Sequence, residues 1–456
     1  MIADILTNFA HKIGMDKSIA YSSGSRVVQG LTGVVSVFFI TTFLTGIEQG
    51  FYYTFGSILA LQIFLELGLT GIMTQYVAHE ASHLQLNADY QYEGEVKYKS
   101  RLASLVHFCV RWYAVLAAVG FFFLMTVGLV FFSRYGDEHS STVSWKLPWL
   151  LICFGTALNT FQAPFVSILM GLGKVKEMSK IGFWQQVILP VTNWIGFALG
   201  FKLYVLGICS IMSVVIWQAY VWKSGLAKIV VHLWKSEITD RVNYMKEIFP
   251  YQWKIAISWV SGYFIFQLFN PVLFATEGAV VAGQMGMTLQ LLNAIQAFAM
   301  SWLNTKVPLY SRLIALKDYL QLDRLFNKTL CQMVSVCIVL LVGFFVVIWL
   351  LNLTQLQFNG HVLAERFLPY LPLLLMMIPV FLNQYTNSWA TYLRCHKQEP
   401  FLIISVCGAL ADGLSTLTLG RWFGLYGITI GYCFLTILFF PWGYWIYKTK
   451  KSEWHQ

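Results

Sequence analysis

Charged residues are scarce in this sequence. Only 11% of the 456 residues are Asp, Glu, Lys or Arg, and 57% are hydrophobic, whereas a soluble domain carries roughly 25% charged residues. Long runs contain no charged side chain at all, namely 112–133, 147–173, 181–201, 255–276, 329–364 and 422–447. Each run is long enough to cross a hydrocarbon core as a helix of roughly 20 residues, and barrel strands would be half as long and would alternate. We therefore expect an all-α membrane protein.

The sequence also lacks the motifs of common enzymes. It has no G-x-x-x-x-G-K-[ST] loop, no D-x-D pair and no G-x-S-x-G elbow. The eight cysteines form no CxxC pair and lie almost entirely in apolar segments, which indicates packing rather than disulfides or metal ligands. The longest stretches expected outside, 133–146 and 352–367, are too short for a soluble catalytic domain. We expect no enzymatic activity and no cofactor.

One metal-site motif is present. His79-Glu80-Ala81-Ser82-His83 matches H-E-x-x-H, in which two histidines one helical turn apart bind zinc and the glutamate acts as general base. A membrane metalloprotease would need a third ligand, and Asp412 is the only obvious candidate. The matching stretch of the second half, 309–313, keeps none of these groups. A metalloprotease is therefore a remote alternative, and an interfacial helix end is the favoured interpretation.

Cutting the sequence at its charged clusters gives twelve spans. They lie near residues 27–46, 51–77, 103–132, 147–171, 181–201, 204–222, 255–275, 279–303, 328–351, 368–393, 400–420 and 424–447. With both termini in the cytoplasm, the cytoplasmic ends and loops hold 25 of the 31 lysines and arginines. This excess sets the orientation, because basic loops stay on the cytoplasmic side. The net charge of +10 is then a topology signal, and no nucleic-acid partner is expected.

The two sets of six spans resemble each other. Leu147-Pro148-Trp149-Leu150 matches Leu368-Pro369-Tyr370-Leu371, and Leu206-Gly207-Ile208 matches Tyr426-Gly427-Ile428 at nearly the same offset. Since six is even, both copies share one orientation, and we expect a pseudo-twofold axis along the membrane normal with a cavity between the lobes. Such internal repeats are typical of transporters.

The twelve spans and the charged segments around them divide the chain into five expected regions. Ile2, Ile5, Leu6, Phe9 and Ile13 recur at helical spacing, which predicts an amphipathic segment on the membrane surface at the N-terminus. The full division is an N-terminal segment, an N-lobe, a cytoplasmic linker, a C-lobe and a cytoplasmic tail, at residues 1–26, 27–222, 223–254, 255–447 and 448–456.

Four basic side chains are candidates for the cavity. Arg111 lies about two turns from the cytoplasmic end of its span, one turn after His107, so both project on one face. Arg26 and Lys254 begin the first span of each lobe. Cations there would suit an anionic headgroup such as a pyrophosphate. The alternative interpretations are snorkelling for Arg111 and ordinary positive-inside anchoring for the other two.

Acidic and amide groups at bilayer depth form a second set. Glu66 and Asp412 are ion-coupling candidates, for H+ or Na+, or are neutral carboxyls bonded to a neighbouring helix. Gln267, Asn270 and Pro271 in the seventh span are cavity or hinge candidates, because a proline frees a carbonyl one turn back and favours a bend.

At this point the chain resembles the multidrug/oligosaccharidyl-lipid/polysaccharide (MOP) exporter superfamily, which includes the MATE extruders, and within it the bacterial Wzx-type polysaccharide flippases. The resemblance covers almost the whole chain. It rests on the length of the chain, on two sets of six predicted helices and on Arg26 at the start of the first of them. It rests also on the Glu66-Leu67-Gly68-Leu69 stretch in the second span and on the Gly173-Lys174-Val175-Lys176 turn after the fourth. The family usually has an acidic residue, often Asp, before Gly-Leu, and here it is Glu66.

The resemblance implies a MATE-like fold and a flippase in the bacterial cytoplasmic (inner) membrane. Its substrate would be an undecaprenyl-pyrophosphate-linked oligosaccharide for a surface polysaccharide such as the O-antigen of lipopolysaccharide. Arg26, Arg111 and Lys254, with His107 nearby, would hold the pyrophosphate. Membrane lipid, a polysaccharide polymerase and glycosyltransferases would be its partners. A MATE-type multidrug or cation antiporter is the alternative, although its proton-coupled members often have an Asp in the first span and 27–47 contains no acid.

Overall fold

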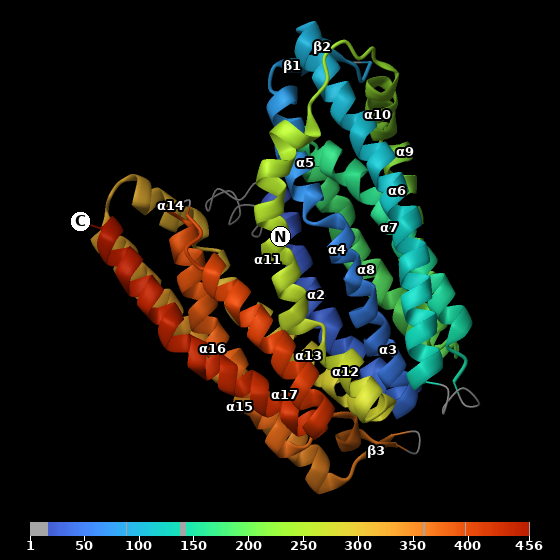
Figure 1. Cartoon of the computed structure of the whole chain (residues 1–456), viewed down its shortest axis with the longest axis vertical. Coiled ribbons are helices and arrows are strands. Elements are labelled where there is room, and N and C mark those ends of the chain that lie inside the picture. Colours follow the sequence, from blue (N-terminus) through green and yellow to red (C-terminus); the bar gives the residue numbers. More distant parts are fainter. Residues whose placement is uncertain (1–16, 88, 137–142, 359–360, 397, 456) are drawn as a thin grey trace, which may run out of the picture. The chain divides into compact units, whose positions relative to one another are not determined.

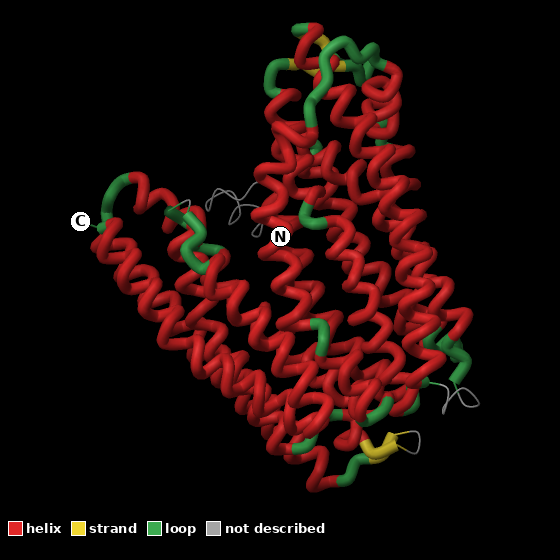
Figure 2. The backbone as a smooth tube through the Cα atoms, viewed as in Figure 1, coloured by secondary structure: helices red, strands yellow, loops and turns green. Residues whose placement is uncertain are grey.

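The computed structural model describes residues 17–87, 89–136, 143–358, 361–396 and 398–455. In these residues the backbone is almost entirely helical, and the strands form two short antiparallel hairpins, β1 (Leu84–Leu86) with β2 (Tyr92–Gly94) and β3 (Gln357–Phe358) with β4 (His361–Val362) (Figure 2). The predicted all-α class is confirmed. The apolar residues that predicted an N-terminal surface helix, Ile2 to Ile13, lie outside the described residues.

The helices of the first half follow the predicted spans (Figure 1). They are α2 (Lys17–Phe43), α3 (Gly46–Leu59), η1 (Ala60–Gln62), α4 (Ile63–Glu66), α5 (Leu69–Ala81), α6 (Val96–Tyr135), α7 (Lys146–Gly171), α8 (Val175–Ala198) and α9 (Tyr204–Lys223). The second predicted span thus consists of α3, η1, α4 and α5. The expected linker contains α10 (Leu226–Lys235) and the short π-helix η3 (Tyr244–Ile248).

The second half has a corresponding series of helices. They are α11 (Phe249–Phe266), α12 (Phe269–Thr276), α13 (Ala279–Asn304), α14 (Val307–Ala315), α15 (Tyr319–Thr354), η4 (Leu363–Arg366), α16 (Tyr370–Arg394) and α17 (Leu402–Trp454). The last of these contains a kink at Gly424 that separates the two predicted final spans.

Five helices of the described chain, α6, α7, α9, α15 and α17, are long and apolar enough to cross a membrane, and the bent pair Gly46–Glu66 and Leu69–Ala81 makes a sixth. Other helices, such as α13 and α16, have enough length but carry more polar side chains. Buried polar groups in membrane helices face other helices rather than lipid. The structure is that of a multi-pass membrane protein.

The chain divides into two compact units. The described residues of the first unit fall within 17–32, 59–134 and 143–259, and those of the second fall within 33–58, 135–136 and 260–455. The lobe boundaries expected from the repeat, at 222 and 255, stay a prediction.

The first unit is built around α7, which packs against α5, α8 and α9. Small residues let the backbones of α7 and α9 approach, because a Cβ on Gly207 would lie 2.5 Å from Leu151 Cβ and one on Gly155 would lie 2.6 Å from Ser210 Oγ. Close approach of this kind drives helix association where lipid is as apolar as the helix surface.

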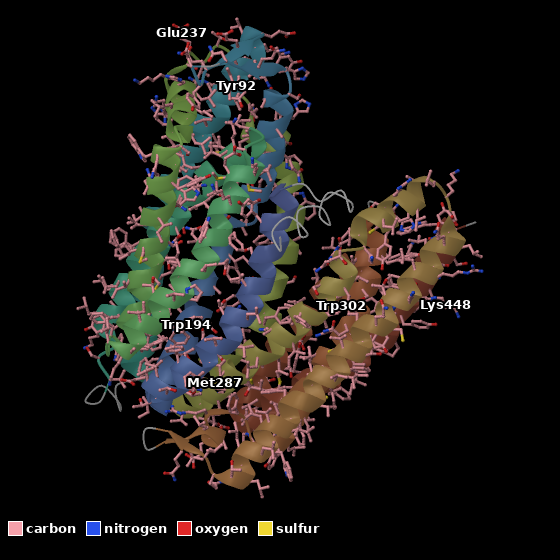
Figure 3. The ribbon with its side chains drawn as sticks, turned by 180° about the vertical axis from the view of Figure 1, so that it is seen from behind. Tyr92, Trp194, Glu237, Met287, Trp302 and Lys448 are labelled. Atoms are coloured by element: carbon pink, nitrogen blue, oxygen red, sulfur yellow. The ribbon has the colours of Figure 1, made fainter. Side chains whose placement is uncertain are left out.

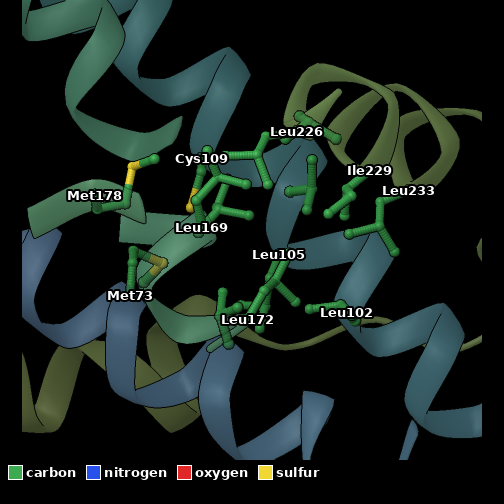
Figure 4. Packing of buried hydrophobic residues seen from close by; sticks show 14 of the residues in the cluster. Met73, Leu102, Leu105, Cys109, Leu169, Leu172, Met178, Leu226, Ile229 and Leu233 are labelled. Atoms are coloured by element: carbon green, nitrogen blue, oxygen red, sulfur yellow. The ribbon is translucent and has the colours of Figure 1, made fainter. Parts of the chain in front are cut away.

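An apolar core fills the part of the first unit where α5, α6, α7 and α10 meet (Figure 4). The amphipathic helix α10 buries Leu226, Ile229 and Leu233 in this core. Tyr92 of β2, labelled in Figure 3, closes it with a hydrogen bond from its hydroxyl to the Leu172 carbonyl at 3.4 Å. The expected linker is therefore partly an integral element of the first unit.

The second unit repeats this packing. Here α16 packs against α13 and α17, as α7 packs against α5, α8 and α9 in the first unit, and α16 packs in addition against α15. Met287 of α13, labelled in Figure 3, is fully buried. The sequence match between the two halves thus has a structural counterpart, because α7 and α16 begin at the matching Leu-Pro-aromatic-Leu stretches and hold the same place in their units.

Candidate functional site: polar groups at breaks in the membrane helices

The second span is broken beside Glu66. Glu66 is the last residue of α4, and the next two residues, Leu67 (φ 51°) and Gly68 (φ 70°), are both left-handed. Glycine accepts this conformation readily, but leucine does so at a cost. The two halves of the span are bent by 43°. The break interrupts the backbone hydrogen-bond ladder near the middle of the span, where carbonyl groups at the end of a helix have no partner within it.

Polar side chains surround this break. The Thr70 hydroxyl donates to Glu66 Oε1 at 2.7 Å. Tyr113 of α6 is fully buried and lies next to Glu66 and Thr70. Glu66 also lines a small pocket between α4, α6 and α7. The polar members of that lining are Gln62, Thr156 and Thr160, and its apolar members include Leu116 and Leu124.

Of the four basic residues predicted to line the cavity, the structure describes the side chains of two, His107 and Arg111. Arg111 is exposed on α6, on the same helical face as the exposed Val115 and Phe122. His107, one turn earlier, is held by α10, because its Nε2 lies 2.7 Å from the Trp234 carbonyl oxygen and its ring stacks on Trp234 at 3.9 Å. The side chains of Arg26 and Lys254 lie outside the described residues. The assignment of these four residues to a substrate stays a prediction.

Asp412 is buried in α17, and its Oδ1 has no hydrogen-bond partner among the described side chains. It lies near Tyr432 of the same helix, whose hydroxyl accepts from Asn383 Nδ2 at 3.3 Å. The structure places Glu66 and Asp412 in different units. Their predicted role in ion coupling is not tested by this geometry.

At the kink in α17, the carboxylate of Glu277 binds the backbone, a contact that the sequence alone did not predict. Gly424 has φ 55° and ψ −132°, and Glu277 Oε1 accepts from the Leu425 amide at 2.7 Å. A Cβ on Gly424 would lie 1.5 Å from that oxygen. Glycine is required here for both reasons, and Glu277 satisfies the first amide after the kink.

The seventh span breaks where the proline predicted a bend. The helix ends at Phe266, Gln267 and Leu268 lie in the turn, and Pro271 is in the first turn of α12, where a missing amide costs nothing. Asn270 is buried and its Nδ2 donates to Ser57 Oγ at 3.1 Å, while its Oδ1 has no partner in the described chain. The helix is thus interrupted in the turn before Pro271, and a hinge or cavity role for Gln267, Asn270 and Pro271 stays a prediction.

The H-E-x-x-H motif forms an ion-pair network instead of a metal site. Glu80 is buried and its Oε1 lies 3.1 Å from Arg101 Nε, while Arg101 Nη2 lies 2.7 Å from Glu247 Oε2. His83 stacks on Tyr98 at 3.9 Å. Within the described ranges, no group of three His, Cys, Asp or Glu side chains is arranged to hold a metal ion. This arrangement leaves the metalloprotease alternative without a third ligand and without a free general base.

The same network fixes the segment before α11 to the first unit. Burial opposes ionisation of Glu247, but the Asn243 amide and the Arg101 guanidinium outweigh it and lower the pKa of this carboxyl. Tyr76 donates a hydrogen bond to the Glu247 carbonyl oxygen. Ser100 Oγ accepts from the amides of Thr239 and Asp240 at 2.7 and 2.8 Å. The chain between α10 and α11 is therefore clamped to α5 and α6.

A histidine pair at the expected cytoplasmic end of the second unit should make stability depend on pH. Burial lowers the pKa of His396 and His455, although Asp323 acts in the opposite direction. Tyr392 connects the group, because its hydroxyl donates to Asp323 Oδ1 at 2.7 Å and lies 3.3 Å from His455 Nε2, and Lys451 pairs with Asp323 at 2.8 Å.

Because both pKa values are lowered in the folded state, stability is full above the ordinary histidine value of about 6.5 and falls as the pH drops below it. We expect the unfolding temperature of the purified protein to decrease between about pH 7 and pH 5.5, and we expect a His396→Gln, His455→Gln variant to lose part of that decrease. Equal pH profiles for the two proteins would contradict this account.

The start of α3 packs closely against α13 within the second unit. A Cβ on Gly50 would lie 1.9 Å from the Ala279 carbonyl oxygen, and one on Gly286 would lie 2.3 Å from the Tyr53 ring. Gln49 Nε2 donates to the Gly283 carbonyl at 2.8 Å, and the Tyr53 hydroxyl donates to Gln290 at 2.7 Å. Arg366 is buried beside this contact, and its Nη2 donates to the Leu44 carbonyl at 2.7 Å.

Sequence reasoning missed several of these polar residues. Tyr113, Glu277 and Arg366 lie in or next to apolar segments, and their partners are far away in the sequence. The signal for the break at Glu66 was present as the Leu67-Gly68 pair, but an isolated glycine in an apolar span indicates many different features.

No protein-family model and no curated protein matches this sequence. Solved structures do resemble its fold. A multidrug resistance MATE-family transporter of the MOP superfamily, in an inward-facing conformation, has a TM-score of 0.61 and 11% identity, over 94% of this chain and 98% of that chain. The lipid II flippase MurJ, in an inward closed conformation, has a TM-score of 0.59 and 12% identity, over 94% and 87%. A variant of the Vibrio cholerae MATE transporter VcmN has a TM-score of 0.55 and 13% identity, over 99% of both chains. The chain therefore has the MATE-like membrane fold that these MOP transporters share, as its sequence predicted.

Proposed function

We propose that this protein is a flippase that moves a lipid-linked oligosaccharide, joined through a pyrophosphate to undecaprenol, across the cytoplasmic membrane by alternating access. The observation that carries the proposal is the shared fold, which extends over 94% of the chain to a protein described as a lipid II flippase. The lipid-linked substrate is consistent with a basic residue inside an apolar helix, Arg111, whose side chain is exposed. Glycosyltransferases would build the substrate, and a polysaccharide polymerase would receive it.

Arg111 is the described side chain that we assign to the pyrophosphate. A guanidinium forms paired, charge-assisted hydrogen bonds with phosphate oxygens. Nothing in the described chain pairs it with a carboxylate. The exposed apolar side chains on its face, Val115 and Phe122, suit a substrate that carries a polyprenyl chain.

Deletion of the gene should abolish one surface glycan and leave its lipid-linked units on the cytoplasmic face. We expect Arg111→Gln to restore about one tenth or less of the glycan, since one charge-assisted contact contributes about 1.5–3 kcal/mol. Lys97→Gln is the matched control, because Lys97 is exposed at the start of the same helix, and it should restore glycan fully.

A multidrug or cation antiporter is the second candidate, because two of the similar structures are MATE transporters. Unchanged surface glycan together with new sensitivity to drugs or dyes after deletion would favour the antiporter and refute the flippase.

A further inference from the structure

We propose that α14 and the first residues of α15 form a surface that binds the headgroups of anionic phospholipids. This α14 surface comprises the exposed residues Lys306, Leu309, Arg312, Leu316, Lys317 and Leu320. It lies entirely in the second unit. Because none of these residues is assigned to the transported substrate, the inference is independent of the proposed function.

One face of α14 is fixed to the second unit by packing. Tyr310 and Leu313 are buried, and the Tyr310 ring meets the ring of Phe326 in α15 edge to face, with the ring centroids 6.0 Å apart. The Phe326 ring lies in turn 4.7 Å from that of Tyr392 in α16. Helix α14 contacts both α15 and α16. These contacts hold the helix in place and leave its other face exposed.

The exposed face combines apolar and basic side chains. Leu309, Arg312 and Leu316 follow one another at spacings of three and four residues, so they share one side of the helix. Leu316 and Leu320 are 65% and 67% exposed. Both lie between the eighth and ninth predicted spans, outside the apolar runs that would cross the hydrocarbon core. Exposed leucines beside cations are typical of helices that lie in the interface of a bilayer.

The charge of the α14 surface favours an anionic partner. Lys306, Arg312 and Lys317 are exposed, and no carboxylate forms an ion pair with them in the described part of the chain. The acid that follows them, Asp318, is the N-cap of α15 and accepts from the Gln321 amide at 3.1 Å. Phospholipid phosphates supply the missing negative charge. The predicted orientation places this surface at the cytoplasmic leaflet, whose anionic lipids create a negative surface potential.

An aromatic pair just before α14 favours a lipid partner over an acidic protein. Trp302, labelled in Figure 3, is exposed in the last turn of α13, and its ring meets that of Phe298 edge to face at 5.4 Å. Tryptophan is enriched at the interface between membrane and water. Helix α14 begins at Val307, five residues after Trp302. Its exposed leucines and cations therefore follow directly from the part of the chain that is suited to the headgroup region.

The test measures thermal unfolding of the purified full-length protein in detergent micelles, with stepwise addition of phosphatidylglycerol or of zwitterionic phosphatidylcholine. We expect phosphatidylglycerol to raise the unfolding temperature by a few degrees until the effect saturates, and phosphatidylcholine to raise it much less. High salt should reduce this difference, because it screens exposed charges. The variant Arg312→Gln, Lys317→Gln should need about thirtyfold more phosphatidylglycerol for the half-maximal rise, since each cation contributes about fivefold.

The variant Lys97→Gln, Lys176→Gln is the matched control, because it removes two exposed cations from the first unit, and it should keep the response of the wild type. The proposal is overturned if both lipids act equally, if the Arg312 and Lys317 variant responds as the wild type does, or if the control loses the response to the same extent. An equal rise with inorganic phosphate would also overturn it, because the surface would then bind a free anion. A response to poly-glutamate but not to phosphatidylglycerol would assign the surface to an acidic protein instead.

Discussion

Replacement of Gly50 by alanine should destabilise the protein by about 1–3 kcal/mol or more, the cost of overpacking a filled interior. The new Cβ would lie 1.9 Å from the Ala279 carbonyl oxygen and 2.8 Å from Ala279 Cα, so the backbones of α3 and α13 must separate. The atoms that the new Cβ would meet belong to the main chain of Ala279, so the overlap cannot be relieved by rotation of a side chain. The Gln49 hydrogen bond to the Gly283 carbonyl, 2.8 Å long, should weaken with the same movement. Thermal unfolding in detergent would measure the loss.

Gly56→Ala is the matched control for this substitution. Gly56 lies in the same helix, and a Cβ there would meet nothing within 4 Å. We expect no loss of stability, and a gain of up to about 0.5–1 kcal/mol from the better helix former. If both variants unfolded like the wild type, α3 and α13 would not be in backbone contact.

Replacement of Arg101 by methionine should cost about 3–5 kcal/mol, because it leaves a buried carboxylate without its cation. The side chain of Glu80 is only 4% exposed, and Arg101 is its ion-pair partner at 3.1 Å. The same change removes the 2.7 Å contact with Glu247 and loosens the segment before α11. Chemical or thermal unfolding of the purified variant would measure both effects together.

Two further variants separate the ion pair from the histidines beside it. A double change, Arg101→Met with Glu80→Leu, should recover much of the loss, because an apolar pair can replace a buried ion pair. His79→Ala should change stability by less than about 0.5 kcal/mol, since the His79 side chain is 73% exposed. One zinc ion per molecule of the purified wild type, absent from His79→Ala, would instead support the metal-site interpretation of H-E-x-x-H.

The sequence predicted those features of the fold that depend on local composition. Apolar runs located the long helices, and the match between Leu147-Pro148 and Leu368-Pro369 predicted the repeated packing that α7 and α16 show. Pro271 predicted the break before α12, because a proline removes a backbone donor wherever it lies.

The candidate site was less predictable because it depends on contacts across the sequence. Glu66 attracted attention as an acid in an apolar span, but Tyr113 did not, since a tyrosine there is equally typical of packing. The left-handed Leu67 cannot be read from sequence, because leucine rarely adopts this conformation. Glu80 is the converse case. Its H-E-x-x-H motif suggested a zinc site with Glu80 as general base, whereas the structure shows an ion pair between Glu80 and Arg101.

The most direct test of the proposed function is translocation in vesicles that contain only the purified protein. A fluorescent oligosaccharide linked through pyrophosphate to a polyprenyl chain is placed in both leaflets, and a membrane-impermeant quencher is added outside. We predict that quenching with the wild type proceeds beyond the outer leaflet to nearly all of the label, and that Arg111→Gln slows this second phase about tenfold or more. Quenching that stops at the outer leaflet, while the same vesicles exchange a cationic drug for Na+ or protons, would contradict the flippase account.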